Sequence, residues 1–237
     1  MEAGFQRARR PEQVAERRTA ILAVARDLLA QRRVTEISLR DLSAEVGLAK
    51  SNVLRYFDSR EGIFLELLKV EWSAWLEALE EPPPAPNGGS PADGLVPPLA
   101  VAGTLARSLA DRPLLCELFS SLGVVLEQNI SIEYALEFKT WSRELQLKLR
   151  SWLIDRLSGL DDRSALTFAT AVVILAGSLW PFARPSDNLV EAARQLGEQD
   201  KESFEEYLRM SLSAHLVGTM VLADSAQGEN SSQVNPP

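Results

Sequence analysis

Apolar side chains recur every three or four residues along most of the chain, which is the pattern of helices with one buried face. No alternation typical of strands and no internal repeat is evident. Outside a pair of short helices between residues 38 and 60, the spacing predicts helices over residues 11–31, 60–80, 99–110, 113–128, 131–157, 164–182, 189–196 and 202–223. The predicted fold class is therefore all-α, with about nine helices.

Two stretches interrupt this pattern. Residues 82–98 (PPPAPNGGSPADGLVPP) hold too much proline and glycine to continue a helix, and they predict a long surface loop. The loop is compatible either with a lid over a ligand entrance or with a tolerated insertion. Residues 224–237 are small and polar, end in two prolines, and predict a disordered tail.

Residues 38–60 (SLRDLSAEVGLAKSNVLRYFDSR) have the layout of a helix-turn-helix. Ser38 is a favourable N-cap, with an acidic Asp41 three positions later. Gly47 suits the left-handed conformation that ends a helix. In the helix that follows, Val53, Leu54 and Phe57 are expected to face the core, and its polar residues to face outward.

The outward residues of this second helix predict a DNA-recognition surface. Asn52 is the best candidate for reading a base, at adenine, and Lys50 fits a guanine or a phosphate. Arg40, Tyr56 and Arg60 fit phosphate contacts. For each residue the alternative is an exposed polar side chain without a contact. The full expected contact set is Arg40, Lys50, Ser51, Asn52, Arg55, Tyr56 and Arg60.

The charge distribution supports this interpretation independently. Residues 1–60 carry a net charge of +4 and the remaining residues −12, within a total of −8. Because phosphate attraction acts over about 8 Å at physiological salt, a basic head on an acidic body still favours DNA. Arg7, Arg9 and Arg10 form an arm that either touches a neighbouring groove or is a solvated tail.

The chain resembles the TetR family of bacterial transcriptional regulators over residues 17–68. Gly47, the Tyr56-Phe57 pair, the polar Asp58-Ser59 and the Arg60-Glu61 pair with its apolar run carry the resemblance. The chain has Leu54 where the family often has an aromatic, and Arg60 where it usually has lysine. The resemblance implies helices near residues 17–31, 39–46 and 50–56 and one starting at 60.

The resemblance also implies domains and partners. Residues 1–62 would be a DNA-binding domain with an N-terminal arm, residues 63–223 a ligand-binding and dimerisation domain, and residues 224–237 a tail. The apolar helices near residues 165–179 and 202–223 would form a four-helix dimer interface; alternatively, both are central to a monomer. The homodimer would bind a palindromic operator in double-stranded DNA as a regulator, more commonly a repressor, released by a small hydrophobic effector. Candidate lining residues are Phe119, Tyr134, Phe138, Trp141 and Trp180, whose spacing also fits core packing.

Signals for other functions are weak. A single cysteine, Cys116, and a single histidine, His215, leave no metal-site pattern and no catalytic triad, and no phosphate-binding glycine motif is present. We therefore expect no enzyme activity, no cofactor and no metal. The charged start and the shortness of the apolar run at 165–179 predict a cytoplasmic, nucleoid-associated protein without a membrane span. The alternative function is an all-α protein-interaction module without specific DNA binding.

Overall fold

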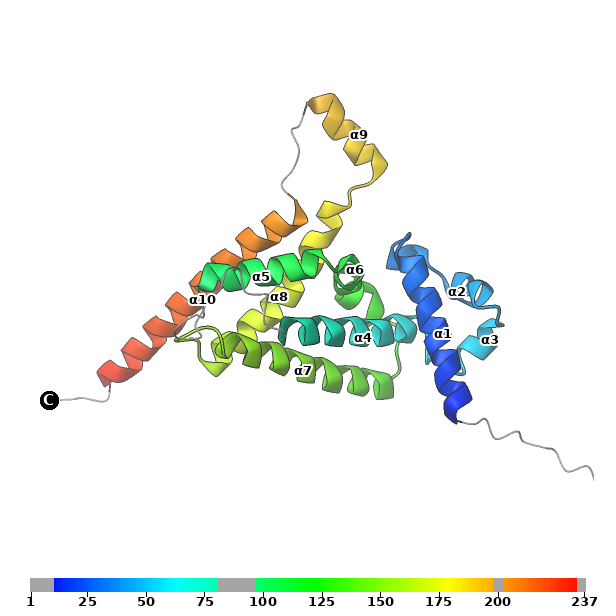
Figure 1. Ribbon diagram of the computed structural model, residues 1–237, viewed down its shortest axis with the longest axis horizontal. Helices are drawn as coiled ribbons and strands as arrows, with labels where there is room; N and C mark the ends of the chain where they lie inside the picture. Colours follow the sequence, from blue (N-terminus) through cyan, green and yellow to red (C-terminus); the bar gives the residue numbers. More distant parts are fainter. Residues whose placement is uncertain (1–10, 81–96, 198–202, 234–237) are drawn as a thin grey trace, which may run out of the picture.

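The computed structural model describes residues 11–80, 97–197 and 203–233, and within these ranges the chain is helical with no strand (Figure 1). The all-α prediction is thereby confirmed. The described helices are α1 (Pro11–Leu29), α2 (Leu39–Glu45), α3 (Lys50–Val53), α4 (Arg60–Glu80), α5 (Pro98–Ala110), α6 (Pro113–Ser121), α7 (Ile132–Ile154), α8 (Asp162–Ala183), α9 (Asp187–Leu196) and α10 (Phe204–Gln233). A short 3-10 turn, η1 (Val34–Glu36), precedes α2, and a π-helical turn, η2 (Leu122–Leu126), follows α6.

Several predicted helix ends differ from the structure. The segment from residue 113 is α-helical only to Ser121 and then widens into η2. The helix predicted over residues 131–157 ends at Ile154, whereas α8 ends at Ala183, one residue beyond its predicted end, with Pro181 in its last turn. The predicted disordered tail is wrong for residues 224–233, because α10 continues to Gln233. Extending an existing helix needs no new nucleus, so a polar sequence can follow on. Residues 234–237 and most of the predicted loop at 82–98 lie outside the described residues.

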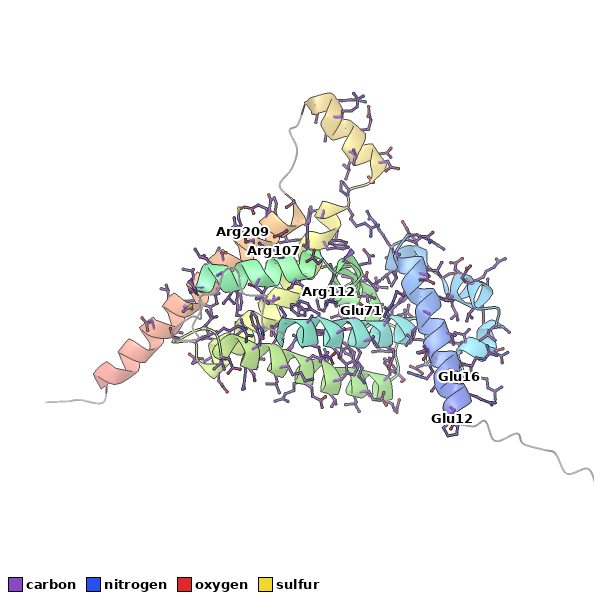
Figure 2. The ribbon with its side chains drawn as sticks, viewed as in Figure 1. Glu12, Glu16, Glu71, Arg107, Arg112 and Arg209 are labelled. Atoms are coloured by element: carbon purple, nitrogen blue, oxygen red, sulfur yellow. The ribbon has the colours of Figure 1, made fainter. Side chains whose placement is uncertain are left out.

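The helices form a small head and a larger body, joined by α4. Figure 1 shows α1, α2 and α3 gathered at one end of α4, with α5 to α8 and α10 around the rest of that helix. Ile21, Leu42, Val53 and Phe64 are fully buried and form the centre of the head. An ion pair between Arg26 and Glu71, which Figure 2 labels on α4, adds to the contact of α1 with α4.

The body has an aromatic centre. The Trp72 ring meets Phe119 and Trp141 edge-to-face, with ring centroids 5.1 and 6.3 Å apart, and Phe138 meets Trp141 at 5.0 Å. Edge-to-face pairs of this kind add to the stabilisation from apolar burial. Trp72, Phe119 and Phe138 are at most 5% exposed, so these rings fill the interior.

Helix α8 is the central helix of the body and contacts α6, α7 and α10. It is long and apolar enough to cross a membrane by length and composition, with a mean hydropathy of 1.8. Its contacts with three other helices are those of a core helix. Helix α9, in contrast, projects away from the body (Figure 1) and buries none of its residues.

The crossing of α6 and α8 depends on Gly177. A Cβ atom at this position would lie 2.8 Å from the backbone carbonyl carbon and oxygen of Phe119, closer than real Cβ atoms approach. The obstacle is backbone, which moves only if the two helices separate. The absence of a side chain at Gly177 therefore allows α6 to lie directly against α8.

We predict that Gly177→Ala lowers the free energy of unfolding by about 1–3 kcal/mol, the usual cost of overpacking, despite alanine's higher helix propensity. Gly103→Ala on α5 is the matched control, because a Cβ there meets nothing within 4 Å. Urea unfolding of both variants measures the difference. Equal stability of the two would contradict the assigned close contact.

Candidate nucleic-acid interface

Helices α2 and α3 are joined by a turn that several hydrogen bonds hold in place. The Ser38 hydroxyl accepts a hydrogen bond from the Asp41 N–H at 3.2 Å, and the Ser38 N–H donates to the Asp41 carboxylate at 2.8 Å, a complete capping box for α2. Gly47 has φ +68°, and the Leu48 N–H reaches back to the Ser43 carbonyl at 2.9 Å. This turn fixes the direction in which α3 leaves α2.

The same capping box sets the charge at the start of α2. Hydrogen bonds from the Ser38 hydroxyl and from its backbone N–H hold the pKa of the Asp41 carboxyl below its usual range, and Arg32 adds to the effect. The carboxylate is therefore charged at neutral pH, where it complements the positive end of the helix dipole.

The structure confirms the predicted turn but shortens the second helix. Helix α3 ends at Val53, and residues 54–56 continue as a tight turn, with the Leu54 N–H bonded to the Lys50 carbonyl at 3.0 Å. Val53 and Phe57 are buried as predicted, whereas Leu54 is 43% exposed, so the prediction that it faces the core is wrong. Its position on the turn after α3 carries its side chain to the surface.

Most of the predicted contact residues are accessible. Lys50, Ser51 and Arg55 are exposed on α3 and the turn after it, and Asn52 is partly exposed. Arg40 is exposed on the adjacent α2. The accessible residues bring positive charge and amide groups to one end of the head, a composition suited to phosphates and base edges.

Two arginines of α1 bear on this surface, and sequence reasoning missed both. Arg17 and Tyr56 line one cleft, together with Glu16, which Figure 2 labels near the start of α1. The Arg18 guanidinium lies 4.3 Å from the centre of the Phe57 ring and donates a hydrogen bond to the Tyr56 carbonyl. The apolar periodicity of α1 in the sequence predicts which of its residues are buried. It does not predict that the polar face of α1 contacts the turn after α3.

Arg60 occupies a different environment from the one predicted. Its Nη1 donates to the carbonyls of Val34 at 3.0 Å and Ile37 at 2.6 Å, and its Nε donates to the Glu61 carboxylate at 2.9 Å. The side chain is only 18% exposed. These three bonds direct the guanidinium into the head, where it holds η1 and the start of α2 against α4.

Four hydrogen bonds tie the head to α6, α7 and α8. The carboxylate of Glu117 on α6 accepts from the Val34 N–H at 3.1 Å, and Arg33 donates to the Arg184 carbonyl at the end of α8. The Ser131 N–H, at the start of α7, donates to the Asp58 carboxylate at 2.9 Å. The hydroxyl of Tyr134 on α7 donates to the Gly62 carbonyl at the same distance. The orientation of the head is thus fixed from the body at several points.

Among the residues that the structure describes, the five candidate ligand residues fall into different environments. Phe119, Phe138 and Trp141 belong to the packed aromatic centre of the body. The Tyr134 hydroxyl donates a hydrogen bond to the Gly62 carbonyl in the first turn of α4. Burial, together with the charge of nearby Glu66, raises the pKa of this hydroxyl. Trp180 lines clefts between the head and the body. Within the described residues, the interpretation of the aromatic stripe as core packing therefore fits Phe119, Phe138 and Trp141.

The remaining chemical groups indicate a structural role. Cys116 is fully buried, its thiol donates to the Leu109 carbonyl at 3.3 Å, and burial raises the pKa of the thiol to about 12. Cys116 therefore acts as a small buried residue of the core. Across residues 11–80, 97–197 and 203–233, no cluster of three or more histidine, cysteine, aspartate or glutamate side chains forms a metal site.

Comparisons with known proteins agree with this geometry. Residues 21–67 match the family model described as bacterial regulatory proteins, tetR family, and residues 70–222 match the model described as tetracyclin repressor-like, C-terminal domain. No curated protein matches the chain.

Solved structures show the same fold. The chain is similar to a tetR-family transcriptional regulator from Streptomyces coelicolor, with 15% identity and a TM-score of 0.55 over 92% of this chain and 86% of that one. It is also similar to the transcriptional regulator FadR from Bacillus subtilis in complex with stearoyl-CoA, with 15% identity and a TM-score of 0.50 over 85% of this chain and 98% of that one.

The geometry of Arg60 predicts a stability effect that the exposed cations do not have. Arg60→Met removes the donors to two carbonyls of the head and should lower the free energy of unfolding by about 1–3 kcal/mol. Lys50→Met is the matched control and should change stability by less than about 0.5 kcal/mol, because Lys50 is exposed. Thermal unfolding measures both. A fully stable Arg60→Met variant would show that the three bonds contribute nothing.

Proposed function

The chain belongs to the tetR family of bacterial regulatory proteins, and on this premise we propose that it binds a palindromic operator as a homodimer and represses transcription until a small molecule releases it. That it is a DNA-binding transcriptional regulator follows from the family itself. The finer proposal has its main support in one observation: an exposed cationic helix-turn-helix is hydrogen-bonded to a helical body that has an apolar outer face. Such a regulator acts in the cytoplasm, at the nucleoid.

The proposed DNA contacts follow the exposure of each side chain. Asn52 reads a base edge, and Lys50 reads a guanine or binds a phosphate, because α3 presents both at its accessible surface. Arg17 joins the set, since it shares a cleft with Tyr56. Arg60 is assigned to positioning instead, because its guanidinium is already bonded within the head. The proposed contact set is Arg17, Arg40, Lys50, Ser51, Asn52, Arg55 and Tyr56.

The dimer proposal is supported by apolar residues that the monomer leaves exposed. Helices α8 and α10 pack against each other. Ile174 is 59% exposed on α8, and Val217 and Val221 are 46% and 59% exposed on α10. Adjacent exposed apolar stripes on two long helices are typical of a protein interface. A second copy would bury both stripes in a four-helix arrangement and place two heads about a two-fold axis.

Release by an effector follows from the contacts between head and body. Since Asp58, Gly62 and Val34 are each hydrogen-bonded to a helix of the body, a change in the body changes the head's orientation. An effector that binds one arrangement more tightly shifts the population towards it. Two heads at an altered spacing no longer fit two half-sites one helical turn apart.

DNA selection tests the operator proposal. From a random pool the protein should select inverted repeats, with an affinity that falls steeply as salt rises. Asn52→Ala should cost about 1–3 kcal/mol at one base pair of each half-site and relax preference there. Arg143→Ala, which removes an exposed cation from α7 of the body, should change neither affinity nor preference. Equal, salt-independent binding to every sequence would instead favour a protein-interaction module.

Sedimentation tests the dimer. The double change Ile174→Glu and Val217→Glu puts charges into both stripes and should convert the dimer into a monomer, with at least a tenfold loss of operator affinity. Leu136→Glu is the control, because Leu136 is 64% exposed but lies on α7 rather than on α8 or α10, and it should leave the mass unchanged. A dimer that survives the double change would place the interface elsewhere.

A further inference from the structure

Two clefts separate the head from the body, and Trp180 and Arg184 line both of them. One, of about 210 Å³, lies between η1 and the corner formed by α6, η2 and α8. The other, of about 360 Å³, lies between the end of α1 and the start of α6. The residues of the smaller cleft that bear on its chemistry are Arg33, Glu117, Val124, Val125, Trp180 and Arg184.

The floor of the smaller cleft is a buried polar group. Glu117 is only 5% exposed, and its carboxylate accepts hydrogen bonds from the Trp180 indole N–H and the Val34 N–H, both at 3.1 Å. The Arg184 guanidinium is 3.9 Å away, a long ion pair. Both carboxylate oxygens are thus engaged by N–H donors of the protein itself.

The rim of this cleft favours an anionic ligand. Arg33 and Arg184 both lie at the cleft and meet there, since Arg33 donates to the Arg184 carbonyl. Two guanidiniums against one carboxylate leave a net positive charge, and guanidinium binds carboxylate in a bidentate geometry. Val124 and Val125 of η2 add an apolar wall, and Val124 is 79% exposed. π-helical turns are frequent at functional sites.

The interior of the body also holds an unpaired polar group. The aromatic rings around Trp72 pack against one another, although within the described residues the buried Trp72 indole N–H has no hydrogen-bond partner. Phe119 and Trp141 both lie against the Trp72 ring, whereas the clefts beside Trp180 lie between the head and the body.

We propose that the cleft between η1 and the α6–η2–α8 corner binds the effector, a small amphipathic carboxylate with its charge on Arg33 and Arg184 and its apolar body on Val124, Val125 and Trp180. This inference rests on the proposed ligand-released function and adds the place and chemical class of the effector. Occupancy draws Arg33 away from the Arg184 carbonyl and so weakens one of the bonds that orient the head.

The test uses three probes with the same ring and different charges: benzoate, neutral benzamide and cationic benzamidine. A fourth probe, 1-naphthoate, is a larger acid. Each is titrated by calorimetry into the full-length protein without DNA. Benzoate or naphthoate should bind once per chain and at least tenfold more tightly than benzamide, and benzamidine should not bind. The bound acid should weaken operator binding by about fivefold or more. Binding of benzamidine in preference to the acids, or of neither acid, overturns the proposal. The DNA selection without any acid then still reports separately on the proposed function.

Variants locate the site. Arg184→Met should lower acid affinity at least tenfold, whereas Arg163→Met, at the exposed first turn of the same helix, should leave it unchanged. Thr35→Trp fills the cleft without removing a charge and should also abolish binding, which decides the question if Arg184→Met fails to fold. Trp72→Phe removes the interior N–H together with part of the ring, at a residue outside the cleft lining, and should not affect binding. Undiminished binding in both cleft variants, or loss in Trp72→Phe alone, overturns the assignment.

Discussion

Glu117 has an almost fully buried carboxylate, and its hydrogen bonds come from both the head and the body. The N–H of Val34 in the head and the indole N–H of Trp180 in the body each donate to one of its oxygens. Burying a carboxylate without such donors costs several kcal/mol. If the head separates from the body, this carboxylate loses a donor and must either become exposed to water or stay buried without it. The close packing at Gly177 holds α6 against α8 and so carries Glu117 to the junction. This one acceptor therefore joins the head to the body.

The sequence predicts best where a signal is local. Helix α4 begins and ends as predicted, because Ser59 accepts a hydrogen bond from the Gly62 N–H at its start and prolines follow its end. The glycine turn of the head and the burial of Val53 also follow from adjacent residues. The tail was misjudged because small polar residues only weakly oppose a helix already formed, and α10 supplies that helix.

The candidate site was less predictable, because its chemistry depends on residues distant in the chain. In the sequence, Arg60 has the features of an exposed cation. In the structure, the carbonyls of Val34 and Ile37 lie beside its guanidinium and accept hydrogen bonds from it. Arg17 gains a possible role only through its cleft with Tyr56. In the aromatic stripe, periodicity alone does not separate Trp180, which borders solvent-accessible clefts, from Trp141, which packs against two other rings. Exposure and tertiary contact, rather than spacing, decide which polar residues are accessible at the surface and which aromatic borders a cleft.

The same contacts account for how a small ligand could affect a distant surface. Helix α4 passes without interruption from head to body, so along its axis the head cannot move independently. The remaining freedom is a rotation about the start of α4, limited by α7 through Asp58 and by α6 and α8 through Glu117 and Arg33. Each limit is one or two hydrogen bonds, worth about 0.5–1.5 kcal/mol net for a neutral pair and more where a charged group takes part. An effector needs a differential affinity of only about 1–3 kcal/mol to overcome one such limit, which lies within the reach of one well-placed carboxylate.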